Sequence, residues 1–172
     1  MGILSGNPKD EPMHYGEIFD VWMFSMKAKN VIACYQTFLN HAGDKDLHPF
    51  IIDMIEQAHL ESKECDALLH ENGILPAPSL PAKPKVKLED IPAGARFTDP
   101  EIAAALSADL SVGLVTSSQI IAKCVREDIA ALFAKYHAAK LALATRALRL
   151  NKQKGWLVPP PLQIKRPEPA TV

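Results

Sequence analysis

Glu56 and His59 have the spacing that best fits metal chemistry, because they form a Glu-x-x-His motif within a predicted helix over 46–72. In bundles that bind two iron or manganese ions, two helices each supply a Glu and the other two each supply a Glu-x-x-His, all pointing inward. At roughly 100° per residue, Glu56 lies about 155° and His59 about 95° from the centre of this helix's apolar stripe. We therefore expect both to face solvent, and we expect no metal or other cofactor, with iron or manganese as the alternative.

Lys140 is the most informative polar residue, because it occupies the core register of the last predicted helix. A buried ammonium group must find a partner or reach solvent. Gly113 on the preceding helix should lie at the same height and leave room, and Asp109 and Glu61 are the nearest carboxylates that lean inward. One interpretation is a polar pocket around Lys140, Asp109, Glu61 and Tyr136 that holds a small anion. The other is a structural ion pair, or a lysine that extends to solvent.

Cysteine, charge and aromatic usage exclude several other classes of protein. Cys34, Cys65 and Cys124 are an odd number with apolar helical neighbours, so we expect small core residues in a reducing, cytoplasmic setting rather than disulfides or a zinc site. The formal net charge is −1, and Trp156 is the only aromatic residue near the basic C-terminal tail, so we expect no nucleic-acid partner. No uncharged run reaches 18 residues, which predicts no membrane span.

A proline-rich segment over 73–98 separates the elements that must position these residues. Its five prolines allow neither a helix nor a central strand to run through it. Helical periodicity fills the chain on both sides, with a turn expected at 125–128. We therefore predict an all-α fold of two helical hairpins joined by a long crossover. The expected bounds are a flexible arm over 1–12, a four-helix bundle over 13–158 and a proline-rich tail over 159–172.

The first predicted helix carries more apolar surface than one bundle contact requires. Phe24, Val31 and Phe38 form a second stripe at intervals of seven residues, beside the main core stripe. This stripe could pack under the proline-rich segment or against another subunit. Alternatively, the first helix is more deeply buried inside one subunit.

Four stretches carry a resemblance to a known family. They are 17–22 (EIFDVW), 35–39 (YQTFL), 125–129 (VREDI) and 154–161 (KGWLVPPP). They resemble an uncharacterised ferritin-like family of spore-forming bacilli, and the exit Lys154-Gly155-Trp156 is similar to that of the spore coat protein F group. The resemblance implies a ferritin-like four-helix bundle and supplies no catalytic residues. A single bundle per chain would suit a homodimer.

Three functions compete at this level. The first is a non-enzymatic bundle that acts by association with itself, with coat proteins or with other proteins, in the cytoplasm or on the spore. The second is a metal-dependent ferritin-like oxidoreductase or metal storage protein. The third is a small-ligand binding bundle centred on Lys140.

Overall fold

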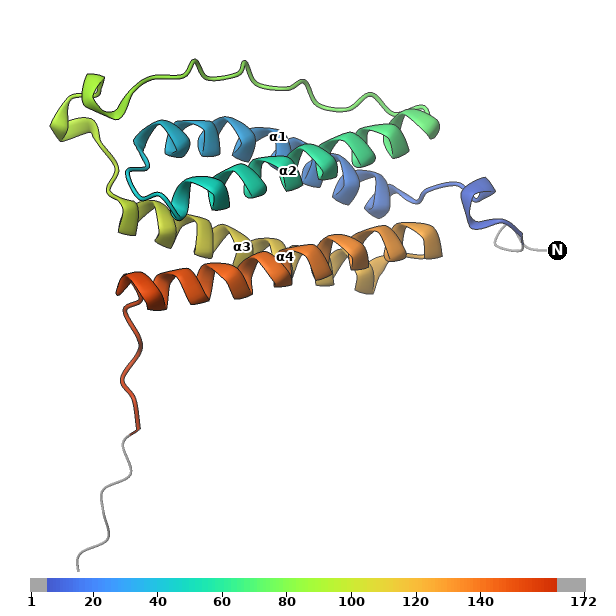
Figure 1. The fold of residues 1–172 in the computed structure, drawn as a ribbon. Coiled ribbons are helices and arrows are strands. Elements are labelled where there is room, and N and C mark those ends of the chain that lie inside the picture. The colour runs from blue at the N-terminus through green and yellow to red at the C-terminus, as the bar shows by residue number, and fades with distance from the viewer. Residues whose placement is uncertain (1–5, 164–172) are drawn as a thin grey trace, which may run out of the picture.

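The computed structural model describes residues 6–163, and four long helices dominate it (Figure 1). The helices are α1 (Tyr15–His41), α2 (Leu47–Glu71), α3 (Asp99–Lys123) and α4 (Glu127–Lys154). Three short 3-10 turns accompany them at Pro8–Asp10, Leu88–Asp90 and Ala93–Ala95. Over this described range the chain contains no β-strand. The predicted all-helical class is therefore confirmed.

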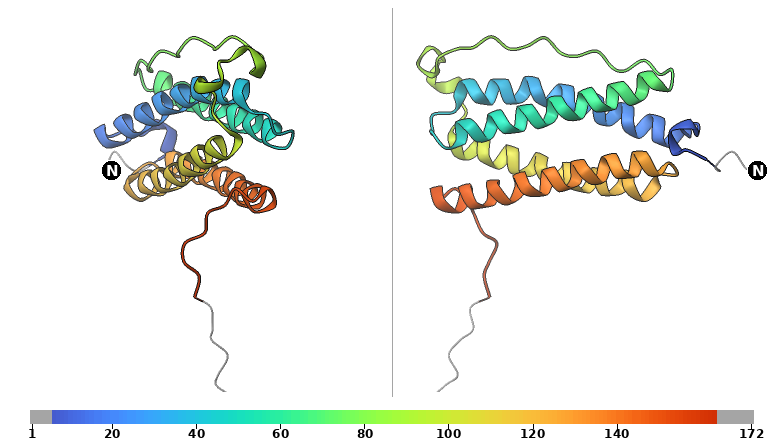
Figure 2. Two further views of the ribbon diagram at one scale, coloured as in Figure 1. Left: turned by 90° about the vertical axis from the view of Figure 1, so that its left-hand side faces the viewer. Right: turned by 45° about the vertical axis from the view of Figure 1, so that its right-hand side comes forward.

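The helices pack as two hairpins, α1 with α2 and α3 with α4, laid against each other (Figures 1 and 2). Smaller contacts join α1 to α3 and α2 to α4. The connection over 72–98 leaves the end of α2 and runs back along the α1–α2 hairpin before α3 begins. Each helix is therefore antiparallel to both of its neighbours.

The helix ends follow the local sequence signals. Thr98 and Glu101 form a capping box at the start of α3, in which Glu101 accepts the N–H of Thr98 at 2.7 Å. Gly155 ends α4 with φ of +70°, a left-handed conformation that glycine adopts without strain. The turn between α3 and α4 occupies residues 124–126, within two residues of the expected position.

The second apolar stripe of α1 lies inside the chain. Phe24 is 6% exposed and contacts the rings of Phe133 and Tyr136 at centroid distances of 4.9 and 5.7 Å. Phe38 is 8% exposed and meets Phe97, at the end of the crossover, at 5.5 Å. The stripe is therefore buried within one subunit at Phe24 and lies under the end of the proline-rich segment at Phe38, so a second subunit does not cover these two residues.

A different stripe of α1 holds the crossover. Polar side chains spaced seven residues apart bond to its backbone: Trp22 to the carbonyl of Leu75, Lys29 to that of Ala77, and Gln36 to the N–H of Lys83. Asn40 adds bonds to the carbonyl of Pro84 and the N–H of Val86. Lys29 is buried and also pairs with Asp66 of α2 at 2.7 Å. The crossover is therefore a fixed strap rather than a free loop.

Glu17 joins the start of α1 to the α3–α4 turn. Its carboxylate is 2% exposed and accepts the N–H of His14, which completes a capping box. The other carboxylate oxygen accepts the N–H groups of Val125 and Arg126 at 2.8 and 2.9 Å. One acidic side chain thus satisfies backbone donors from two segments that are far apart in the sequence.

Arg126 continues this connection at the same end of the bundle. It is 2% exposed and donates to the carbonyl of Glu11, to Oδ1 of Asn72 and to both carboxylate oxygens of Asp128. The hydrogen bonds from Arg126 lower the pKa of Asp128. Because the folded pKa is depressed, this pair adds stability above the unfolded value of about 3.9, and that stability is lost as the pH falls through the folded value.

The two ends of the chain were expected to be a flexible arm (1–12) and a proline-rich tail (159–172). Residues 1–5 and 164–172 lie outside the described part. In the arm, Pro8–Asp10 forms a 3-10 turn next to α4, and Glu11 accepts the bond from Arg126. In the tail, residues 159–163 have no regular secondary structure.

We predict that Arg126→Ala lowers the free energy of unfolding by about 3 kcal/mol, because it leaves buried acceptors and a carboxylate without their donor. Urea denaturation followed by circular dichroism measures the loss. Arg146→Ala is the matched control, since Arg146 is half exposed and pairs with Asp53 at the surface, and it should cost less than about 1 kcal/mol. Equal losses in the two variants would contradict the role given to Arg126.

Candidate functional site

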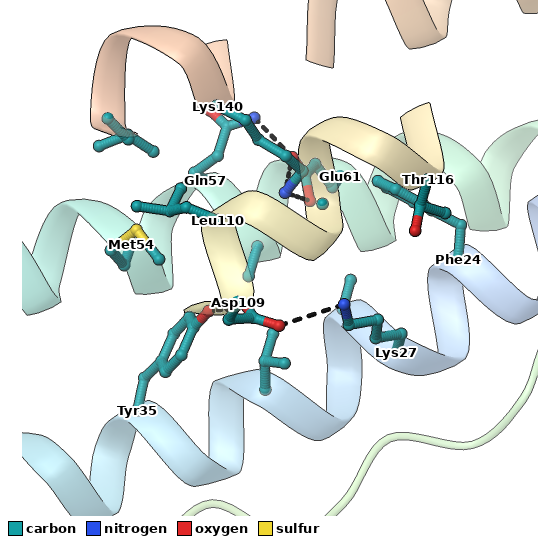
Figure 3. A pocket seen from close by; sticks show the side chains of 15 residues that line it. Phe24, Lys27, Tyr35, Met54, Gln57, Glu61, Asp109, Leu110, Thr116 and Lys140 are labelled. Carbon is teal, nitrogen blue, oxygen red and sulfur yellow. Dashed lines mark hydrogen bonds and ion pairs between the residues drawn. The ribbon is translucent and has the colours of Figure 1, made fainter. Parts of the chain in front are cut away.

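A cavity lies between the four helices near the middle of the bundle (Figure 3). Its lining includes two ion pairs and the apolar side chains of Phe24, Met54, Leu110 and Leu143. The space open to the centre of a water molecule is about 30 Å³. Since one water needs about 10–15 Å³ by this measure, the cavity has room for about two waters.

Lys140 and Glu61 form the first ion pair. The ammonium lies 2.8 Å from one carboxylate oxygen and 2.9 Å from the other, and the two side chains are 15% and 3% exposed. Gln57, one turn before Glu61 on α2, donates a further bond to its carboxylate at 3.0 Å. Gly113 lies against this lysine, because a Cβ on it would sit 2.7 Å from Cδ of Lys140. The expected height of Gly113 and the pairing of Lys140 with Glu61 are both observed.

Asp109 lines the same cavity with partners of its own. Its carboxylate lies 3.1 Å from the ammonium of Lys27 and accepts a hydrogen bond from the hydroxyl of Tyr35. Burial raises the pKa of Tyr35, and the negative charge of Asp109 raises it further, so this hydroxyl stays protonated as a donor. Figure 3 shows the two groups converging on Asp109 from α1.

Tyr136 does not line the cavity, which corrects the four-residue pocket expected from the sequence. Its ring is fully buried in the aromatic cluster with Phe24 and Phe133. Its hydroxyl lies 3.9 Å from the sulfur of Cys65. The structure therefore brings Lys140, Asp109 and Glu61 to one cavity and places Tyr136 in the neighbouring core.

The charges around the cavity balance in pairs. Two lysines face two carboxylates, and each ammonium is within 3.1 Å of its partner. A bound anion would therefore compete with a carboxylate that is already in place. The arrangement fits a structural pair of salt bridges better than an anion site.

Sequence reasoning missed Lys27 and Tyr35. Tyr35 lies in core register on α1, where its ring is expected to pack, so nothing in the sequence marks its hydroxyl as a cavity group. Lys27 lies about 120° from the centre of the core stripe at 100° per residue, at the edge of the stripe of Phe24, Val31 and Phe38, so its phase does not identify a partner. Its long side chain reaches back to the cavity, which phase alone does not reveal.

Glu56 and His59 are both exposed on α2, so the orientation expected from their phase is confirmed. Among residues 6–163, no three His, Cys, Asp or Glu side chains come close enough together to hold one ion. The carboxylates nearest the bundle centre, Glu61 and Asp109, each face a lysine.

We predict that Lys140→Met lowers the free energy of unfolding by about 3 kcal/mol, because it leaves the carboxylate of Glu61 buried without its ammonium. The double variant Lys140→Met with Glu61→Leu should regain most of this loss, since apolar residues often replace a buried pair at little cost. Urea denaturation of both variants tests the idea.

Lys135→Met is the control for that comparison, because Lys135 pairs with Glu64 at the surface and the change should cost less than about 1 kcal/mol. If Lys140→Met were as stable as the wild type, the cavity would be open to solvent and the structural interpretation would be wrong.

The three cysteines provide a further test, because the structure divides them. Cys65 is fully buried, and burial raises its pKa to about 12, whereas Cys34 is exposed and Cys124 is half-buried. The expectation that all three are core residues is therefore wrong for Cys34. We predict that a disulfide reagent at pH 8 modifies Cys34 first and reaches Cys65 only after denaturation. Rapid modification of Cys65 in the native protein, identified by peptide mass spectrometry, would contradict the packing.

Comparison with known proteins places the chain in a family. The model described as "Protein of unknown function (DUF3231)" matches residues 1–168. "Uncharacterized protein YvdQ" of Bacillus subtilis (strain 168) is 47% identical over 166 residues, covering 96% of this chain and 98% of that protein. A crystal structure described as that of a "putative spore coat protein" from Bacillus halodurans C-125 matches with a TM-score of 0.91 at 46% identity, covering 92% of this chain and 100% of that one. The chain therefore belongs to the DUF3231 family.

Proposed function

We propose that this protein is a non-enzymatic, ferritin-like helical bundle that acts by protein association during sporulation, as a component of the spore coat or of a complex linked to it. The structural neighbour described as a "putative spore coat protein" is the observation that carries this proposal. It shares the fold over nearly the whole chain at an identity of 46%, so a related role is a reasonable inference.

The ferritin-like part of the proposal rests on topology. Each helix is antiparallel to its neighbours, and one long strap joins the two hairpins, which is the connectivity of ferritin-like bundles. Members of that fold that bind two metal ions place six carboxylate and histidine ligands at mid-bundle. At that level this chain has two carboxylates, Glu61 and Asp109, and a lysine beside each.

The remaining buried polar side chains support a structural rather than a catalytic interpretation. Glu17 and Arg126 join backbone segments at one end, and Lys29 holds the strap. These groups already make their hydrogen bonds to other parts of the protein. A protein built in this way acts through its surface, with coat proteins, other proteins or a second copy as partners.

We predict that an epitope-tagged copy, produced in sporulating Bacillus subtilis, is recovered in the coat extract of purified spores. The reason is that a coat-associated bundle stays with the spore after the mother cell lyses. Immunoblots of the lysate, the washed spores and the detergent extract of the coat measure its distribution. An unrelated helical protein with the same tag and promoter is the control.

Recovery of the tagged protein only in the lysate would contradict the proposal.

Elemental analysis of the purified protein distinguishes this proposal from its main alternative. Two iron or manganese ions per chain would instead favour a metal-dependent oxidoreductase or a storage protein.

A further inference from the structure

We propose that two copies of this chain associate through the outer face of the α3–α4 hairpin. This outer face comprises the exposed side chains on the side away from α1 and α2, between residues 104 and 122 of α3 and between 131 and 148 of α4. The inference deepens the proposed function, on which it rests, by naming the first partner as a second copy.

The outer face is apolar and uncharged. Its large side chains are Val112, Val115, Leu141 and Leu148, which are 46–58% exposed. The positions between them are mostly alanine, serine and threonine. The surface of a soluble bundle normally carries about 25–35% charged residues, so an uncharged surface two helices wide calls for an occupant.

Charged residues lie beyond the end of this face, where Arg149 and Lys152 follow Leu148 on α4, or reach away from it. Within 104–122 the only charged residue is Asp109, which turns into the cavity. On α4, Lys135 and Arg146 reach sideways to carboxylates of α2. The surface is therefore uncharged because its ionic groups are engaged elsewhere in the chain.

The composition of α3 is more apolar than its packing needs. Judged by length and composition alone, the stretch Ala93–Lys123 contains a helix apolar enough to cross a membrane. In this chain, 28% of its most apolar window is buried. The core stripe of α3 explains that buried share. The outer face accounts for the rest. Of the described chain, Trp156–Val158 lies beside this face at one end, near Ala104 and Leu148.

The opposite side of the bundle, formed by α1 and α2, differs from the outer face in what lies on it and in its charge. The strap lies along the α1–α2 hairpin (Figures 1 and 2), whereas on the outer side of α3 and α4 the described chain places only Trp156–Val158, at the end near Leu148. The exposed side of α2 carries charged residues such as Glu56 and Lys63. Tyr15, Phe19 and Met23 also form an exposed apolar stripe near the start of α1, but that stripe is one helix wide, whereas the outer face spans two helices.

The dimensions of this face suit a second copy. The face spans 19 residues of α3 and 18 of α4, so it is about 27–28 Å long at 1.5 Å per residue, and two helices side by side are about 20 Å wide. It therefore offers about 550 Å² per copy, or about 1,100 Å² in total, just above the roughly 1,000 Å² that a biological interface should bury. A two-fold dimer needs such a self-complementary patch, and an uncharged face does not repel its own copy.

The spacing of the face suits helices as the occupant. Exposed positions repeat every seven residues on both helices: Ala104, Ser111 and Ser118 on α3, and Ala134, Leu141 and Leu148 on α4. A seven-residue repeat favours knobs-into-holes packing against another helix. The small residues lie on α3 and the leucines on α4, so α4 of one copy fits against α3 of the other.

The test is the oligomeric state of purified full-length protein by sedimentation equilibrium. We expect a particle of twice the 18.8 kDa chain mass for the wild type. Leu141→Glu should weaken the dimer by at least about 100-fold, because it places a charge in the centre of the interface. Circular dichroism and melting temperature should stay unchanged, since Leu141 is half exposed in the single chain.

Leu60→Glu is the matched control, because Leu60 is 42% exposed on α2, away from the outer face, and this variant should remain dimeric. A monomeric wild type at 100 μM, or a Leu141→Glu variant as dimeric as Leu60→Glu, would overturn the inference. The inference would also be overturned if a monomeric wild type floated with lipid vesicles and Leu141→Glu abolished that flotation, because the face would then bind a membrane. A monomer that still enters the coat would overturn the dimer and leave the proposed function standing.

Discussion

Every other feature of this bundle depends on where the strap has to run. Its prolines prevent helix formation, so residues 72–98 must pass along the whole α1–α2 hairpin before α3 can begin. Side chains of α1 at three positions spaced seven residues apart bond to its backbone and satisfy part of its hydrogen-bonding capacity. This course makes all neighbouring helices antiparallel. It also places the strap on the α1–α2 side of the molecule, away from α3 and α4.

The interior follows a second constraint, that charge is buried only with a partner. Glu61 meets Lys140, Asp109 meets Lys27 and Tyr35, and Arg126 meets Asp128. Each contact joins different elements or fixes a turn, so the polar groups determine how the hairpins align while the apolar clusters supply most of the stabilisation. Among the described residues, Ser117 Oγ is the one buried side-chain polar atom that has no hydrogen-bond partner.

Local signals in the sequence predicted the helices and the strap, because caps, prolines and core register act over short distances, and they placed Glu61 with Asp109 among the carboxylates nearest to Lys140. The partners of Asp109 were not predictable, since Lys27 starts at the edge of an apolar stripe of α1 and reaches the cavity along its own stem. Tyr35 and Tyr136 both lie in core register, and only the axial alignment of the helices decides which hydroxyl meets Asp109. Glu17 and Arg126 belong to the stretches 17–22 and 125–129 that carried the family resemblance. Only the folded structure shows that these two residues act together at one end of the bundle.

The two sides of the molecule use the apolar content of the helices differently. The second stripe of α1 resembled a subunit interface in the sequence, but the aromatic cluster and the end of the strap bury it. Exposed apolar side chains remain on α1 at Tyr15 and Phe19, but the wider surface is on α3 and α4, where Val115 and Leu141 face outward without a charged neighbour on the same face. A chain that needed only to be stable could carry charged residues at these positions at little cost, because they make no core contact. Their apolar character is therefore best explained by a contact outside the chain, and the self-complementary pattern of the face makes a second copy the simplest one.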